Sequence, residues 1–383
     1  MLNRSLGPLH KRLDCAHEMM SHVESTDEFI ALGNYIGNMY GSLVCMGDRQ
    51  AVVDPICCFG SRKRYKDFLK ELDVYSDEAM QNFVLKKDYH CGYIGSILPT
   101  VEKECDIICP MMFEAEDGMT RKQFREVFFA FLDSIQMADM FKRLVKNKQI
   151  HSSYEGIDVG NLGFTLFNPI NGDLDIFVKD FHNTLNHMNT LVHELGHGYD
   201  MEHFNGTIKE YNQYFYISFF GEVIPRLMER LLHRFLLRNR IIVESAKDSF
   251  VNFEDLNHDY LLKGYILSLL DSKTLLSHEF CECDSEDLIR TIKKYFLEGA
   301  NLRDYVEEIQ HYDLSDTYTY LYGDILSLFL CDEIEKNGMN NELMEYFMRH
   351  RTEPFQEEML TKNGLEPSSY VKLYKKEVNL IKK

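Results

Sequence analysis

Apolar residues recur at helical spacing along most of this chain. Between residues 121 and 145 they are separated by four, three and four positions, at Phe124, Phe128, Phe131 and Ile135. This period places them on one face of a helix. We therefore predict a single helix from Arg121 to Val145 and a mostly helical region over residues 1–149. The helical period returns after residue 180 and continues to the C-terminus, so the chain is predicted to be mainly α.

The period changes between residues 150 and 180. Two short apolar runs, at 163–167 and 174–178, flank the pair Asn171 and Gly172. An Asn-Gly pair between two such runs is a strong signal for a β-hairpin, because both residues adopt positive φ readily. We expect a small hairpin or sheet here, beside the helix described next.

A second amphipathic helix is predicted around residues 185–198. Its apolar stripe has spacings of three, four and three and consists of Leu185, Met188, Val192 and Leu195. Asn183 or Thr184 could cap the start of this helix. Gly196 would allow a neighbouring backbone to approach closely.

This helix carries the segment His193-Glu194-Leu195-Gly196-His197. Imidazoles four positions apart on a helix differ by about 40° in azimuth, so His193 and His197 can bind one ion. Glu194 can then act as the general base towards a metal-activated water. The pattern is typical of zinc-dependent peptide hydrolases and predicts one Zn²⁺ per chain. The alternative is that these are ordinary polar residues on a partly buried helix.

A catalytic zinc ion usually has three protein ligands, and two residues compete for the third position. His203 follows His193 by ten residues, as in metzincin proteases, but Asp200 stands where those proteins have a glycine that lets the chain turn. Glu222 lies in another apolar stripe with helical spacing, formed by Phe220, Ile224, Leu227 and Leu231. We favour Glu222.

Glu222 and Glu229 are seven residues apart, which places them two helical turns apart on one face. Two carboxylates on an apolar face are costly unless a cation or hydrogen-bond donors meet them. A metal at Glu222, and the N–H group of a metal-bound imidazole at Glu229, would meet this need. In the simpler alternative, both carboxylates pair with Arg226 and Arg230.

These residues resemble the M3 family of zinc metallopeptidases, which includes oligoendopeptidase F and thimet oligopeptidase. Members typically have H-E-x-G-H, then a segment such as Ala-Glu-Val with the third ligand, and a second Glu seven residues further on. Glu222 and Glu229 fall on those positions, and the resemblance covers roughly residues 150–330. The chain departs from the family at Asp200, where many members have His, and in a shorter region before the motif.

The resemblance implies further catalytic residues downstream. Family members have a histidine followed by a tyrosine-rich helix that closes over the substrate and stabilises the tetrahedral intermediate. Residues 309–312 and 318–323 are similar to this part, so His311, Tyr318 and Tyr320 become candidates, with Tyr320 as the oxyanion donor. The resemblance also implies a zincin-like fold with a deep substrate cleft, and short unstructured peptides as substrates. An edge strand of the predicted hairpin could hold such a peptide by backbone hydrogen bonds, or the hairpin could simply pack against the helices.

The charge and composition of the chain limit the kinds of molecule and compartment that we expect for it. The net charge of −19 opposes binding to phosphate backbones, so we expect no nucleic-acid partner. No apolar run reaches 18 residues, so we expect no membrane span. The ten cysteines lack the spacing of a disulfide framework, and the chain starts with polar residues rather than a signal peptide. These features predict reduced thiols and a cytoplasmic location.

We therefore expect two regions: a helical one at 1–149, which could close over the cleft, and a zincin-like catalytic one at 150–383. The predicted function is that of a zinc-dependent endopeptidase, an oligopeptidase that hydrolyses short unstructured peptides. Two alternatives stay open. One is a catalytically inactive peptide-binding protein that retains the metal site, and the other is a metzincin-like protease with His203 as the third ligand.

Overall fold

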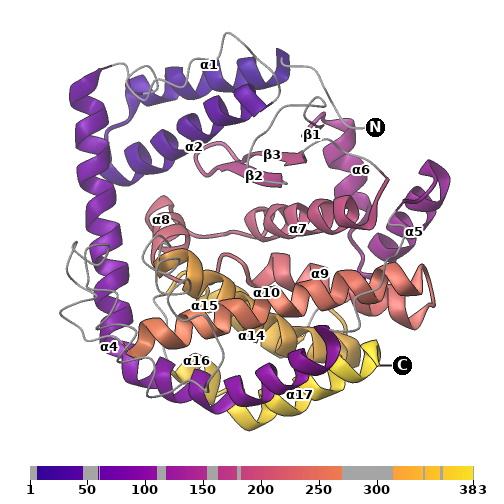
Figure 1. Cartoon of the computed structure of the whole chain (residues 1–383). Coiled ribbons are helices and arrows are strands. Elements are labelled where there is room, and N and C mark those ends of the chain that lie inside the picture. Colours follow the sequence, from indigo (N-terminus) through magenta and orange to yellow (C-terminus); the bar gives the residue numbers. More distant parts are fainter. Residues whose placement is uncertain are drawn as a thin grey trace. The chain divides into compact units, whose positions relative to one another are not determined.

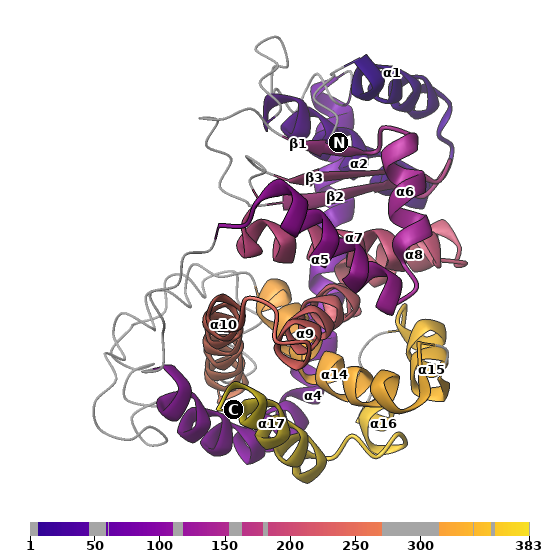
Figure 2. The ribbon, with the colours of Figure 1, turned by 90° about the vertical axis from the view of Figure 1, so that its right-hand side faces the viewer.

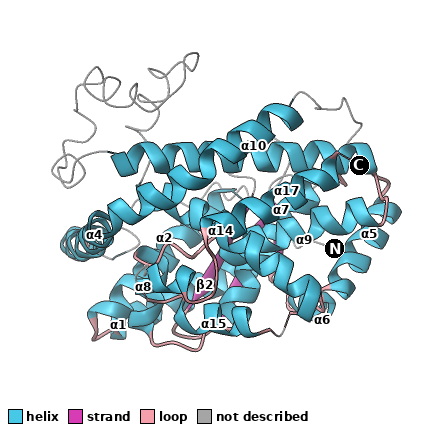
Figure 3. Ribbon diagram, turned by 90° about the horizontal axis from the view of Figure 1, so that it is seen from below, coloured by secondary structure: helices cyan, strands magenta, loops and turns pink. Residues whose placement is uncertain are grey.

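The computed structural model describes residues 7–45, 59, 61–109, 118–152, 163–178, 183–269, 314–339, 341–353 and 357–382. Helices dominate these residues, and a single three-stranded sheet is found among them (Figure 3). This confirms the prediction of a mainly helical fold with a small sheet. Within the described ranges, no helix combines the length and the apolar character needed to cross a bilayer.

The chain forms two compact units, each assembled from separate stretches of sequence. The first contains Met1–Val74, Phe113–Gln213 and Ile224–Ser249, and the second contains Tyr75–Met112, Tyr214–Val223 and Phe250–Lys383. Both units therefore include residues from before and after position 149. The long helix α4 (Arg62–Ile108) contributes residues to both.

The sheet belongs to the first unit and has the strand order β1-β3-β2 (Figure 1). β2 (Gly163–Asn168) and β3 (Asp173–Val178) are antiparallel and form the predicted hairpin. Gly172 adopts a φ of 74° in the connection, as the predicted turn requires. β1 (Ile150–Ser152) pairs in parallel with β3 and was not predicted, because three residues are too few to show a period.

Helices cover both faces of this sheet (Figures 1 and 2), namely α1 (Gly7–His22) and α2 (Thr26–Cys45) on one side and α7 (Leu185–Glu202) on the other. Successive side chains of β3 point to opposite faces. Leu174 and Ile176 face α7, where they lie against Gly198. Asp175 faces the other way and forms a buried ion pair with Arg12 of α1. The hairpin is thus held from both sides, and its register against α7 is fixed.

The prediction of a single helix from Arg121 to Val145 is wrong, because the structure has two helices in this range. α5 (Arg121–Ser134) ends with Ile135 as its C-cap residue, and α6 (Ala138–Lys146) begins three residues later. Between them lies Gln136, whose φ is 61°. A single residue in the left-handed region redirects the chain without interrupting the apolar spacing on either side. The spacing alone therefore could not reveal the break.

The remaining helices of the two units follow α7 along the chain, and the described residues between them form no strand. They are α8 (Ile208–Tyr216), α9 (Val223–Arg238), α10 (Val243–Leu269), α14 (Leu314–Asn337), α15 (Glu342–His350), α16 (Glu357–Thr361) and α17 (Pro367–Ile381). In the second unit, α14 is buried on nearly all sides between Thr317 and Asp332, although Thr317, Asp324 and Ser327 are polar. α17 packs on it, and its buried Tyr370 donates its hydroxyl to Oδ2 of Asp324 at 3.0 Å.

α7 and α9 approach each other closely at Gly196. A Cβ atom at Gly196 would lie only 2.6 Å from Cα of Pro225, at the start of α9. Because this neighbour is backbone, it cannot rotate away. The glycine therefore sets the spacing between α7 and the start of α9.

Replacing Gly196 with Ala should destabilise the protein. Forcing a methyl group between two backbones should lower the free energy of unfolding by about 1–3 kcal/mol, measured by urea denaturation. Gly92→Ala is the matched control, because Gly92 lies on an exposed part of α4 with nothing within 4 Å of an added Cβ. This control should gain up to about 1 kcal/mol from helix propensity. Equal effects at the two sites would contradict a specific close approach at Gly196.

Candidate metal centre

α7 forms where the apolar stripe predicts it. Thr184 is the N-cap residue, and its side chain accepts a hydrogen bond from the backbone N–H of His187. The stripe residues are buried, and His193 and His197 lie beside them, each half-buried. Their ring centroids are 5.0 Å apart. The helix thus presents both imidazoles on one side, as predicted.

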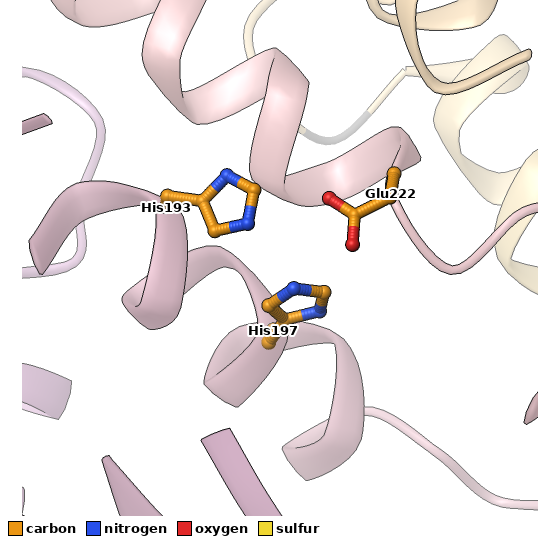
Figure 4. A group of neighbouring side chains, drawn as sticks. All are labelled: His193, His197 and Glu222. Carbon is orange, nitrogen blue, oxygen red and sulfur yellow. The ribbon is translucent and has the colours of Figure 1, made fainter. Parts of the chain in front are cut away.

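Glu222 lies in the turn that precedes α9, not within the helix as its apolar stripe indicated. Pro225 explains the difference, because proline lacks an N–H and is accommodated only in the first turn of a helix. The helix therefore cannot begin as early as Phe220. Figure 4 shows His193 and His197 projecting from α7 towards the Glu222 carboxylate. One ligand atom from each of these three residues lies within 4.8 Å of the other two.

A glycine of α14 lies directly against Glu222. In the second unit, a Cβ at Gly323 of α14 would lie 2.8 Å from Cβ of Glu222. The α14 backbone therefore packs directly on Glu222. Nothing in the sequence pattern singled out Gly323.

Glu229 contacts one of the two imidazoles. Its Oε1 lies 3.6 Å from Nδ1 of His193, and its Oε2 accepts a hydrogen bond of 2.8 Å from Nη1 of Arg226. Burial alone would raise the pKa of Glu229, but Arg226 and His193 outweigh it and lower the pKa to about 2. The carboxylate is therefore charged and favours a proton on Nδ1 of His193, which leaves Nε2 to face a metal. Glu229 thus contacts His193, as the prediction of a metal-bound imidazole requires. It also pairs with Arg226, as the simpler alternative requires.

Glu194 is almost completely buried, with 4% of the residue exposed. Its Oε2 is 2.7 Å from the hydroxyl oxygen of Thr165, and the same hydroxyl is 3.0 Å from the main-chain oxygen of Glu194. A Cβ at Gly163 would lie 3.0 Å from Oε1. Sequence reasoning missed both Gly163 and Thr165, whose only signal was their place in the predicted hairpin.

His203 does not join this cluster. It follows the last residue of α7 as its C-cap, lies exposed, and donates from Nδ1 to the main-chain oxygen of Tyr199 at 2.8 Å. Asp200 remains within the helix and is buried, so the chain makes no early turn that would bring His203 back. Among the described residues, the third candidate ligand beside the histidines is Glu222.

The two tyrosines predicted as catalytic residues, Tyr318 and Tyr320, lie in different environments. Tyr318 is fully buried and donates its hydroxyl to the main-chain oxygen of Gly264 at 2.7 Å. Tyr320 is half-buried, and its ring stacks on that of Tyr260 with centroids 4.7 Å apart. His311 lies outside the described residues.

The part of α14 around Tyr320 adjoins the Glu222 segment. Thr319 lies 3.6 Å from the position of a Cβ at Gly221, and Gly323 packs on Glu222 itself. Tyr320 lies between these two contacts in the sequence. Its assignment as an oxyanion donor stays a prediction, as do those of Tyr318 and His311.

Two solved structures resemble this chain. No family model matches it, and neither does any curated protein. PZ peptidase A, solved with an inhibitor, aligns with a TM-score of 0.52 and 12% sequence identity over 98% of this chain and 81% of its own. A protein described as oligoendopeptidase F from Bacillus anthracis str. Ames gives a TM-score of 0.41 at 12% identity, over 91% of this chain and 63% of its own. The likeness to PZ peptidase A shows that the chain shares the fold of that structure, which agrees with the predicted mainly helical fold with a small sheet.

Proposed function

We propose that this protein is a zinc-dependent peptidase that hydrolyses short, unstructured peptides. The observation that carries the proposal is the cluster of His193, His197 and Glu222, with Glu194 adjacent on the same helix. Two imidazoles and one carboxylate are the ligand set of many catalytic zinc sites, which keep a further position open. The likeness to PZ peptidase A adds support by analogy, because that structure of the same fold is a peptidase.

The arrangement around the ligands also fits zinc. Metal-binding histidines usually donate their second ring N–H to a carboxylate, and Glu229 lies beside Nδ1 of His193. The Glu222 side chain approaches the histidines from a separate segment, so the three ligand atoms surround a point rather than lie in a row (Figure 4).

Each residue has a proposed task. When bound, zinc supplies Lewis-acid chemistry that polarises a peptide carbonyl and makes water nucleophilic near neutral pH. Glu194 accepts the proton of the attacking water and later delivers it to the departing amine. Tyr320 donates its phenolic O–H to the developing oxyanion, and His311 assists. β2 is the strand that could align an extended peptide through backbone hydrogen bonds.

The test is cleavage of a quenched fluorescent peptide with and without 1,10-phenanthroline. We expect cleavage that the chelator abolishes and added Zn²⁺ restores. The matched control is 1,7-phenanthroline, an isomer whose nitrogens cannot chelate one ion, and it should have no effect. Cleavage that resists metal removal would contradict a metallopeptidase. Binding without cleavage by the zinc-loaded protein would favour the inactive peptide-binding alternative.

A further inference from the structure

We propose that Thr165 is a positioning residue that holds the Glu194 carboxylate in a single orientation. The inference rests on the proposed function in one respect, since Glu194 is the general base only if the protein is a peptidase. The contact itself is independent of that assumption. It joins the hairpin to the helix that carries the histidines.

The contact is short and directed. The Thr165 hydroxyl donates towards Oε2 of Glu194 at 2.7 Å, within the usual range for an O–H group and a carboxylate. The main-chain oxygen of Glu194, at 3.0 Å, is a second acceptor for the same hydroxyl. The hydroxyl has one proton, so these two oxygens of Glu194 share it, and the contact to the carboxylate is the shorter one. This fixes the carboxylate relative to the helix axis.

Gly163, two residues before Thr165 in β2, also lies against the Glu194 side chain. Alternate residues of a strand point to one face, so Gly163 and Thr165 both face α7. A Cβ at Gly163 would lie 2.9 Å from Cγ and 3.0 Å from Oε1 of Glu194. The missing side chain thus leaves room for the Thr190 methyl group, 2.7 Å from that position, and for one carboxylate oxygen, while the hydroxyl of Thr165 binds the other oxygen.

The strand pairing of β2 fixes the position of the Thr165 hydroxyl relative to α7. Thr165 is paired with Ile176 in the centre of the antiparallel ladder, and Ile176 is buried against α7. The branched Cβ of threonine restricts χ1, so the direction of the hydroxyl is determined by the strand. Because Glu194 is buried, turning its carboxylate away from Thr165 would leave a buried carboxyl oxygen without this donor.

The kinetic test compares Thr165→Val with Thr165→Ser in the zinc-loaded enzyme. Valine keeps the shape and removes the hydroxyl, so we expect kcat to fall about 10- to 100-fold while KM changes less than about twofold. Serine restores the hydroxyl and should keep kcat within about threefold of the original. Thr361→Val is the matched control, since the exposed Thr361 hydroxyl binds the Glu357 oxygen within α16. It should leave both constants unchanged, and zinc content should be equal in all variants.

A second measurement does not depend on activity. Thr165→Val and Glu194→Ala are combined in a double-mutant cycle, with urea unfolding of the zinc-free protein as the readout. Thr165→Val should lower the unfolding stability constant about tenfold when Glu194 is present and hardly at all when it is Ala. If the valine variant does not fold, Thr165→Ala replaces it in both tests.

The outcomes separate the two proposals. A protein that cleaves no peptide but shows the coupling would refute the peptidase function and retain the contact. An additive cycle would overturn the inference, and so would a Thr165→Val enzyme with unchanged kcat. A fall in kcat that serine does not reverse would also overturn it, since the hydroxyl would not be the cause.

Discussion

Replacing Glu194 with Gln should leave zinc bound and reduce kcat about 1000-fold. Glutamine keeps the size of the side chain and can still accept a hydrogen bond from Thr165 at its amide oxygen. It cannot take a proton from water, so the loss reflects general-base catalysis alone. Zinc content by metal analysis and kcat from the fluorescent peptide assay are the two measurements.

Glu202→Gln is the control for this substitution. Glu202 is the last residue of the same helix, and its carboxylate pairs with Arg143 away from the histidines. The same chemical change at this position should leave kcat and zinc content unaltered. A Glu194→Gln protein with full activity would show that another group is the base. One that lost its zinc would place Glu194 among the ligands instead.

Much of the site was predictable because its parts are local in sequence. The pair His193 and His197 depends only on helical spacing, and the apolar stripe of α7 shows that a helix is present. The hairpin followed in the same way from two apolar runs and a turn at Gly172. Where one periodic element supplies all the residues, spacing is enough.

The remaining features depend on contacts between distant segments, which spacing does not encode. Gly163 and Thr165 meet Glu194 only because β2 lies across α7. Gly323 lies 101 positions after Glu222 and packs on it only because α14 is the central helix of its unit. A polar residue in a strand, or a glycine in a helix, has many ordinary explanations before its neighbour is known.

Helix boundaries were also hard to predict, because they depend on the backbone conformation of single residues. The turn at Gln136 and the late start of α9 before Pro225 both interrupt an apolar pattern that continues unchanged. For Glu222 the consequence is functional. A residue in the turn before a helix can direct its side chain more freely than one inside the helix, where χ1 is restricted. The same carboxylate would have had fewer ways to meet the histidines from within α9.

Replacing Glu222 with Ala should weaken zinc binding by more than about 100-fold. Loss of a residue that merely orients a ligand typically costs 10- to 100-fold in metal affinity, so loss of a direct ligand should exceed this range. Affinity is measured by competition with a chromophoric chelator, and circular dichroism checks that the helices are retained. Glu229→Gln provides the intermediate case, because it alters only the partner of His193, and its affinity should fall about 10- to 100-fold.

His203→Ala is the decisive comparison for Glu222→Ala. His203 is a potential zinc ligand in the same helical region, but it is exposed at the end of α7 and bonded to Tyr199. Its loss should leave zinc affinity unchanged. The reverse pattern, with normal affinity in Glu222→Ala and a large loss in His203→Ala, would establish the metzincin-like ligand set and refute the one proposed here. Equal, small losses in both would mean that the third ligand lies elsewhere, because two imidazoles alone do not make a three-ligand catalytic zinc site.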